Sequence, residues 1–295
     1  MLPCVPELPE VEVTRRQVAP LLQGRTIARV ITTGPSNFFL TAPGQLRKRL
    51  TGRRIETLSR RGKYLVAELD DGCRLVLHLG MTGQLFGSGT RSPRLYRVAD
   101  RALLRTHEIP AFEPDHHTHL RLEFSDRGPE VLFRDPRKFG KVQHLGRTET
   151  CDRLTRLGVD ALDAQPLELW KRTRHRRVAV KSALLDQSLL AGVGNIYADE
   201  ALHGARLRPD RAVGRLSRPK WRELLTEVKS MMLRSIEVGG TTISDFVHPN
   251  GAEGAYTVEL RVYGRTGLPC PNCNTSIRRV VIGGRSSHFC PHCQR

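Results

Sequence analysis

Apolar and polar positions follow two different periods along the chain. Near the front, apolar residues recur on a helical spacing up to Gly24, which predicts an amphipathic first helix that stops there. Its apolar positions are Val11, Val18, Leu21 and Leu22. Short β-rich segments separated by turn residues follow, and we expect strands at residues 26–33, 53–59, 64–69, 74–79, 119–124, 130–133 and 141–145. Many short strands with turns between them favour a β-sandwich.

The second half of the chain changes to helical periodicity from about Cys151. One helix is predicted to end at Gly239-Gly240 and to bury a single apolar face. That face consists of Trp221, Leu224, Leu225, Val228, Met231, Met232 and Ile236. Residues 87–114, between the two sets of strands, are rich in Gly, Pro and Arg, and we expect a long irregular connection without an assigned function.

Length and charge restrict the class of protein. The 295 residues are enough for two domains and a small appendage. A formal charge of +18 and a pI near 10.4 indicate a polyanionic partner, although a ribosomal or membrane-surface protein would have a similar charge. We find no apolar run of membrane-spanning length and no secretory leader, so we expect a cytoplasmic protein with no membrane partner.

Four of the seven cysteines form two Cys-x-x-Cys pairs separated by sixteen residues near the end of the chain. They are Cys270, Cys273, Cys290 and Cys293. This spacing predicts four thiolate ligands for one structural Zn²⁺ on a β-hairpin. His288 and His292 could compete as ligands, but four cysteines suffice, and we interpret both histidines as non-ligating. The metal would supply the folding energy that so short a segment lacks.

Residues 6–12 read Pro-Glu-Leu-Pro-Glu-Val-Glu and mark a helix start, because proline and acidic residues favour the first turn. The segment resembles the opening of the bacterial formamidopyrimidine-DNA glycosylases. The resemblance implies that Pro6 is the N-terminal residue, that its secondary amine attacks C1′ of a damaged nucleotide, and that Glu7 is an acid/base beside it. Such an amine has a pKa of about 8, so part of it is nucleophilic at neutral pH.

Five residues precede Pro6 in this sequence, and a proline inside the chain has no nucleophilic nitrogen because that nitrogen belongs to an amide. We expect Val5 to be the initiating codon, read as methionine and then removed. The alternative, with Met1 to Val5 retained, is a zinc-dependent DNA-binding protein without catalysis.

Further motifs of the family follow in order. A lone lysine is usually a surface charge, but Lys63 begins a Lys-Tyr-Leu motif whose lysine, by resemblance, binds phosphate and donates a proton in β-elimination. His-Leu-Gly-Met-Thr-Gly at residues 78–83 and Asp-Pro-Arg-Lys-Phe-Gly at residues 135–140 imply that Met81, Arg137 and Phe139 fill the space left by an extruded nucleotide. His117 is a weaker candidate for a DNA contact, because His116 and His119 make the alignment ambiguous.

The second half resembles the helix-two-turn-helix of the same family. Gly-Val-Gly-Asn-Ile-Tyr at residues 192–197 implies that Asn195 begins a helix whose amides favour a phosphate. Arg177 stands where the family has another basic DNA contact. Arg285 stands on the zinc hairpin where the family's arginine grips the lesion phosphates and acts in δ-elimination. The loop from Gly240 to Tyr256 would close over an oxidised purine, and we assign no base-reading residue in it.

The expected fold is α+β, with three domains. These are an N-terminal β-sandwich with an N-terminal helix (6–148), a helical helix-two-turn-helix domain (149–260) and a β-hairpin zinc finger (261–295). The resemblance implies a monomeric, cytoplasmic bacterial enzyme, acting at the nucleoid, that excises oxidised purines from damaged double-stranded DNA and cleaves the abasic strand by β,δ-elimination. No obligate protein partner is implied. The alternative within the superfamily is an endonuclease VIII-like enzyme for oxidised pyrimidines.

Overall fold

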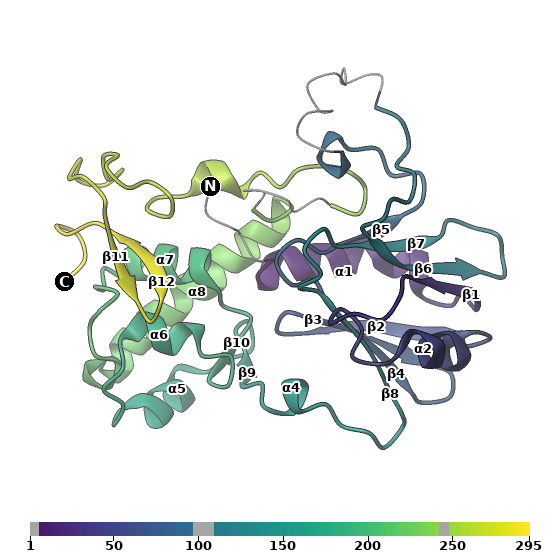
Figure 1. Cartoon of the computed structure of the whole chain (residues 1–295). Helices are drawn as coiled ribbons and strands as arrows, with labels where there is room; N and C mark the ends of the chain where they lie inside the picture. Colours follow the sequence, from purple (N-terminus) through teal and green to yellow (C-terminus); the bar gives the residue numbers. More distant parts are fainter. Residues whose placement is uncertain (1–5, 97–108, 242–247) are drawn as a thin grey trace. The chain divides into compact units, whose positions relative to one another are not determined.

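The computed structural model describes residues 6–96, 109–241 and 248–295, and the chain divides into two compact units (Figure 1). The first unit contains the chain up to Cys151 together with Val238–Ala255. The second contains Asp152–Glu237 together with Tyr256–Arg295. Within the described residues, no helix combines the length and the apolar character that crossing a bilayer requires.

The first unit is the predicted β-sandwich, preceded by helix α1, Leu8–Leu22. One antiparallel sheet has the strand order β1 (Ile27–Thr32), β6 (Thr118–Phe124), β7 (Val131–Arg134) and β5 (Gln84–Gly87). The other has the order β2 (Ile55–Arg61), β3 (Tyr64–Leu69), β4 (Arg74–His78) and β8 (Lys141–Leu145). Figure 1 shows the two sheets as two layers. The predicted strands are confirmed, with ends that differ by up to two residues.

Alternation along the strands creates the core of this unit. Leu120, Leu122 and Phe124 of β6 are buried, whereas the two residues between them are partly exposed. The same core contains Val11 and Leu22 of α1, along with residues of both sheets. Burying apolar side chains stabilises the fold by about 1.5–3 kcal/mol for each large residue. The position of α1, and therefore of the residues just before it, is fixed by this core.

Two elements of the sandwich were not predicted. Helix α2, Pro43–Leu50, has only eight residues, with Pro43 at its start and Leu46 and Leu50 on its buried side. Strand β5 has four residues, all of them buried, so it lacks the alternation by which strands are recognised.

The second unit is helical, as expected. It contains α4 (Asp152–Thr155), α5 (Pro166–Thr173), α6 (Val180–Leu185), α7 (Asn195–Gly204) and α8 (Arg218–Glu237), with short strands β9 (Val159–Asp160) and β10 (Leu190–Ala191). The predicted apolar face of α8 is buried, and Trp221 donates from Nε1 to Thr173 Oγ1 at 3.1 Å. Hairpin β11 (Arg278–Ile282) and β12 (Arg285–Phe289) packs on α7 through β12.

A buried carboxylate connects α1 to β2. Glu12 Oε2 accepts from Arg60 Nε at 3.2 Å, and Glu12 also pairs with Arg15 and Arg16 on its own helix. Burial raises the pKa of Glu12, but hydrogen bonds from Arg15 and Arg16 outweigh it and lower that pKa to about 2. Arg60 Nη1 in turn donates to the carbonyl of Gly62 at 2.9 Å, next to Lys63.

We predict that Glu12→Gln weakens the fall in the free energy of unfolding as the pH becomes acidic. Because folding lowers the pKa of Glu12 from 4.5 to about 2, the ionised carboxylate stabilises the fold above pH 4.5, and this contribution disappears as the pH falls through that interval. The free energy of unfolding, measured by urea denaturation at several pH values, should therefore fall less steeply with decreasing pH in the variant than in the unsubstituted protein. Glu56→Gln, an exposed position on β2, is the matched control. Parallel profiles for Glu12→Gln and the unsubstituted protein would contradict the prediction.

Candidate functional site

The start of α1 is held by one buried carboxylate. Glu7 is the N-cap residue and forms a reciprocal capping box with Glu10. Glu10 Oε2 accepts from the Glu7 backbone N–H at 2.8 Å, and Glu10 Oε1 accepts from the Thr241 backbone N–H at the same distance. Glu7 is 2% exposed and Glu10 is fully buried. Pro6 lies buried immediately before this cap, so its position is set by the helix start.

Lys63 lies at the tip of the hairpin between β2 and β3. Arg61 pairs with Tyr64, so Gly62 and Lys63 form a two-residue turn. Gly62 has a φ of +57°, as the first position of a type II′ turn requires. Lys63 is half-buried there. The turn therefore fixes where the lysine backbone lies.

Met81, Arg137 and Phe139 belong to two turns that pack on each other. A Cβ at Gly80 would lie 2.5 Å from the backbone of residues 139 and 140, so the close approach of the turns requires glycine. Met81 is half-buried, whereas Arg137 and Phe139 are exposed, Phe139 to 48%. The Arg137 guanidinium lies 5.3 Å from the centre of the Phe139 ring. The structure thus brings the basic and the apolar candidate together at the surface.

Asp135 organises the second of these turns. Its carboxylate accepts from the backbone N–H of Gly140 at 2.6 Å and of Arg137 at 3.3 Å, and from the hydroxyl of Thr82. Asp135 is fully buried. A substitution that removes these acceptor oxygens would therefore free the backbone that presents Arg137.

The structure resolves part of the ambiguity among the histidines. His119 is fully buried, with its ring 5.1 Å from that of Phe38, so it cannot reach a partner at the surface. His116 is exposed and His117 is half-buried, with their rings 3.8 Å apart. Burial is the largest cause that lowers the pKa of His117, which favours the neutral imidazole at neutral pH.

In the second unit, Asn195 is the first residue of α7, as predicted, and Gly194 is the N-cap. The Asn195 Oδ1 atom is buried and lacks a hydrogen-bond partner within the described part of the chain. Gln187 shapes the preceding turn, because its side chain accepts from Gly192 N at 2.9 Å and donates to Val193 O at 2.8 Å. Arg177 is exposed, three residues before α6 begins.

Arg285 is exposed at the first position of β12. Ile282 pairs with Arg285 across the turn formed by Gly283 and Gly284, whose φ values of +55° and +73° suit a type I′ hairpin. The hairpin tip that carries this arginine therefore has a defined turn geometry.

A buried ion pair that sequence patterns did not reveal holds this hairpin. Lys181 Nζ lies 2.6 Å from Asp199 Oδ1 and donates to Ser286 O at 2.5 Å. Asp199 Oδ2 accepts from the His288 backbone N–H at 2.8 Å and lies 3.0 Å from its Nδ1. Lys181 and Asp199 are both fully buried. The signal available in the sequence was two opposite charges inside apolar helical segments.

The four predicted cysteines form a metal site. Their Sγ atoms all lie within 4.8 Å of one another. The Cys273–Cys290 and Cys270–Cys293 Sγ distances are 3.4 Å and 4.0 Å. Thiolates about 2.3 Å from a tetrahedral zinc lie about 3.8 Å apart, so the geometry fits one structural zinc ion. His288 is paired with Asp199 instead.

His203 of α7 lies beside this cluster. Its Nε2 atom is 3.4 Å from Cys270 Sγ, and the residue is 1% exposed. Burial, with a smaller effect from Arg261, lowers the pKa of His203 to about 4. A neutral imidazole with its proton on Nε2 can donate to a metal-bound thiolate. The zinc site is therefore joined to the helical part of its own unit.

Comparisons with known proteins agree with this arrangement. Residues 5–142 match the model of the formamidopyrimidine-DNA glycosylase N-terminal domain, residues 157–247 the H2TH domain of the same glycosylases, and residues 267–295 the zinc finger found in FPG and IleRS. The formamidopyrimidine-DNA glycosylase of Thermomicrobium roseum is 42% identical, over 98% of this chain and 99% of the relative.

Solved structures give the same result. MutM (Fpg) from Thermus thermophilus has a TM-score of 0.81 at 37% identity, with 98% of each chain covered. A MutM complex with DNA containing carbocyclic 8-oxo-G has a TM-score of 0.83 at 32% identity and covers 98% of this chain and all of the other. A β-sandwich followed by an H2TH unit with a Cys4 zinc finger defines a class of DNA glycosylases. The chain belongs to the formamidopyrimidine-DNA glycosylase family.

We predict that removing the zinc, by chelation or by Cys290→Ser, abolishes DNA binding and strand cleavage but leaves the β-sandwich folded. The metal organises the hairpin that presents Arg285, whereas the sandwich has its own core. Zinc content, DNA binding and unfolding of the sandwich should be measured on the same samples. Cys73→Ser, outside the cluster, is the matched control. Full activity in a zinc-free sample would refute this prediction.

Proposed function

We propose that Pro6 is the nucleophile of this glycosylase, which excises oxidised purines such as 8-oxoguanine and formamidopyrimidines and then cleaves the abasic strand. The observation that carries the proposal is the position of Pro6, directly before the N-cap of α1, where Glu10 fixes the backbone of the next residue. Membership of the family supplies the class of reaction. The proposal requires a free amine at Pro6, and therefore a functional chain that begins there.

In the proposed reaction, the Pro6 nitrogen attacks C1′, and the bond from C1′ to the damaged base breaks as the base leaves with a proton. The nitrogen loses its own proton, and the C1′–O4′ bond then breaks, with O4′ taking up a proton, as the iminium forms between the nitrogen and C1′. Abstraction of a C2′ proton then expels the 3′ phosphate, and a second elimination expels the 5′ phosphate. We assign acid/base work at the sugar to Glu7, proton donation to Lys63 and phosphate binding during the second elimination to Arg285.

The remaining candidates contact DNA in this proposal. Phe139 wedges a base step while Arg137 and Met81 occupy the space of the extruded nucleotide. The exposure of Phe139 and Arg137 at the surface supports these roles. Arg177 and His117 are further DNA contacts, His117 the weaker of the two, and Asn195 contacts a DNA phosphate. Asn195 is suited to this because it opens a helix, where backbone amides favour phosphate.

The proposed setting is the bacterial cytoplasm, where the enzyme acts on the nucleoid as a monomer without an obligate protein partner. The surplus of 48 lysines and arginines over 30 acidic residues supports binding to duplex DNA. The substrate class is tested by comparing two duplexes. One carries 8-oxoguanine opposite cytosine, and the other carries thymine glycol. Faster excision of thymine glycol would replace the proposal by an endonuclease VIII-like activity.

A free amine at Pro6 can be detected chemically. A protein that begins at Pro6 should be trapped on lesion DNA by borohydride through Pro6, because only a free secondary amine forms the reducible iminium. The full 295-residue chain should trap at least about a hundredfold less, since its Pro6 nitrogen is an amide. Peptide mapping of the adduct and the intact mass of the protein purified from its own host are the measurements. Strong trapping by a protein that retains Met1 to Val5 would refute the role of Pro6.

Substitutions of Lys63 and Phe139 should impair different steps, catalysis and lesion recognition respectively. Lys63→Ala should still bind lesion DNA but react about a hundredfold more slowly, as expected for the loss of a general acid. Phe139→Ala should lose about tenfold of its preference for lesion over normal DNA, because the extruded state loses its wedge. Binding titrations and single-turnover rates on the same duplexes distinguish them. Equal losses of binding and rate in both variants would show that the roles are wrong.

A further inference from the structure

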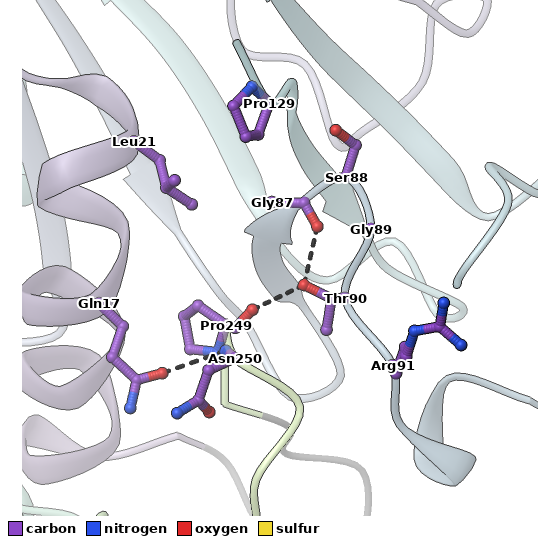
Figure 2. Close-up of a pocket in the computed structure, with 10 residues that line it drawn as sticks. All are labelled: Gln17, Leu21, Gly87, Ser88, Gly89, Thr90, Arg91, Pro129, Pro249 and Asn250. Carbon is purple, nitrogen blue, oxygen red and sulfur yellow. Dashed lines mark hydrogen bonds between the residues drawn. The ribbon is translucent and has the colours of Figure 1, made fainter. Parts of the chain in front are cut away.

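The first unit contains a pocket of about 470 Å³ between α1 and residues 87–91 (Figure 2). Thr90 donates to the carbonyl of Pro249 at 2.8 Å. Gln17 accepts from Asn250 N at 3.3 Å. The polar side chains that line the pocket are thus already paired with described residues, and they hold the surrounding loops together.

His203, in the second unit, is buried with one ring nitrogen unpaired. The residue is 1% exposed, and its Nδ1 atom has no hydrogen-bond partner in the part of the chain that the structure describes. Its other ring nitrogen, Nε2, lies 3.4 Å from Cys270 Sγ. Cys270 is fully buried as well, so the contact is shielded from bulk water. A buried polar group placed in this way needs a physical explanation.

The surroundings of the two nitrogens indicate which of them carries the imidazole proton. A neutral imidazole has one N–H donor and one acceptor nitrogen. With the proton on Nδ1, a buried donor would lack an acceptor, and the Nε2 lone pair would face the negative sulfur of a metal-bound cysteine. With the proton on Nε2, the donor is satisfied by that sulfur. The second tautomer is therefore favoured, and His203 donates to Cys270.

The burial of Cys270 explains why its sulfur needs such a donor. Zinc-bound cysteines are thiolates, and four of them exceed the charge of one Zn²⁺, so the loaded cluster has excess negative charge. Cys273 and Cys293 are partly exposed and can be solvated, whereas Cys270 and Cys290 are buried. Cys290 Sγ accepts from the Cys293 backbone N–H at 3.4 Å. The corresponding donor to Cys270 is a side chain, that of His203.

Helix α7 holds the His203 ring in this position. His203 follows Asp199 by four residues and Glu200 by three, so the three side chains project from one side of the helix. Asp199 accepts from the backbone N–H of His288, and Glu200 accepts from those of residues 261–263. The same side of α7 is therefore bonded to the chain before the cysteine cluster and to strand β12 within it.

We propose that His203 raises the affinity of the zinc finger for its metal by donating a hydrogen bond to the Cys270 thiolate. The donor stabilises the negative charge of this sulfur at a place that water does not reach, and so favours the metal-bound state. His203 acts through Cys270 and is not a ligand, because the four cysteines complete a tetrahedral site. The inference concerns metal binding alone and is independent of the proposed nucleophile.

Four variants separate the hydrogen bond from the shape of the ring. His203→Phe and His203→Leu occupy the space without a donor. His203→Gln provides an amide N–H that is the same number of bonds from the backbone as Nε2 of histidine. His292→Phe removes an exposed histidine that lies between two of the cysteines, and it is the matched control.

Competition between the full-length protein and the chromogenic chelator pyridylazoresorcinol measures zinc affinity. We expect His203→Phe and His203→Leu to bind zinc about ten- to hundredfold more weakly, which is the usual effect of losing a hydrogen-bond partner of a metal ligand. His203→Gln should recover most of this loss. His292→Phe should bind zinc as tightly as the unsubstituted chain.

Cobalt substitution tests the hydrogen bond at the sulfur itself. A donated hydrogen bond lowers the energy of the sulfur electrons, so its loss should move the sulfur-to-cobalt charge-transfer band to longer wavelength. We expect this shift in His203→Phe and His203→Leu, and a band close to that of the unsubstituted chain in His203→Gln.

The outcomes distinguish a donor from a space-filling residue. Weaker zinc binding in His203→Phe and His203→Leu that His203→Gln reverses, together with the band shift, supports the inference. Unchanged affinity in both donor-free variants overturns it. Equal weakening in all three His203 variants, or weakening with no shift of the band, shows that the ring only fills space and also overturns it. If one donor-free variant does not fold, the other is compared with His203→Gln by the same criteria.

Discussion

The buried Glu10 carboxylate is the contact on which the front of the first unit depends. It accepts from the backbone N–H of Glu7, beside Pro6, and from that of Thr241, which follows more than two hundred residues later. Burying an ionised carboxylate costs free energy unless its oxygens accept hydrogen bonds. The Glu10 carboxylate is therefore stable in this position only while both backbone N–H groups donate to it. One side chain thereby fixes both the proposed nucleophile and one end of the proposed base-closing segment.

In the second unit, two adjacent residues of α7 are also buried carboxylates that accept hydrogen bonds from backbone N–H groups. Asp199 holds β12 through His288, and Glu200 accepts from three successive backbone N–H groups, those of residues 261–263, at 2.7–2.9 Å. Burial raises the pKa of Glu200, although these donors oppose the shift. The hydrophobic core of the zinc finger is a small cluster of Val262, Cys270, Ile277 and Cys290. Because so few apolar residues cannot hold the zinc finger in place, Asp199, Glu200 and the metal supply the remaining contacts that position it.

Local sequence patterns predicted many of the features that depend on neighbouring residues, although they did not predict helix α2. Strands 64–69 and 141–145 have the expected bounds, and the spacing of Cys270 to Cys293 identified the metal site. The pairing of Glu10 with Thr241, or of Arg94 with Glu253, joins residues more than 150 positions apart, and no periodicity encodes such a contact. Strand β5 was missed for another reason, since complete burial removes the alternation that marks a strand.

These contacts also explain how a chain with a charge of +18 can present its cations outward. A carboxylate only accepts hydrogen bonds, and backbone amides can satisfy it without an arginine or lysine. Asp135 is the clearest case, because it holds the amides of Arg137 and Gly140 while the Arg137 side chain stays exposed. Acids inside the fold thus set the backbone beneath basic side chains at the surface, and those side chains keep their charge for phosphate. Lys181 differs from these surface cations, because it is fully buried and its ammonium group pairs with Asp199 to hold the hairpin.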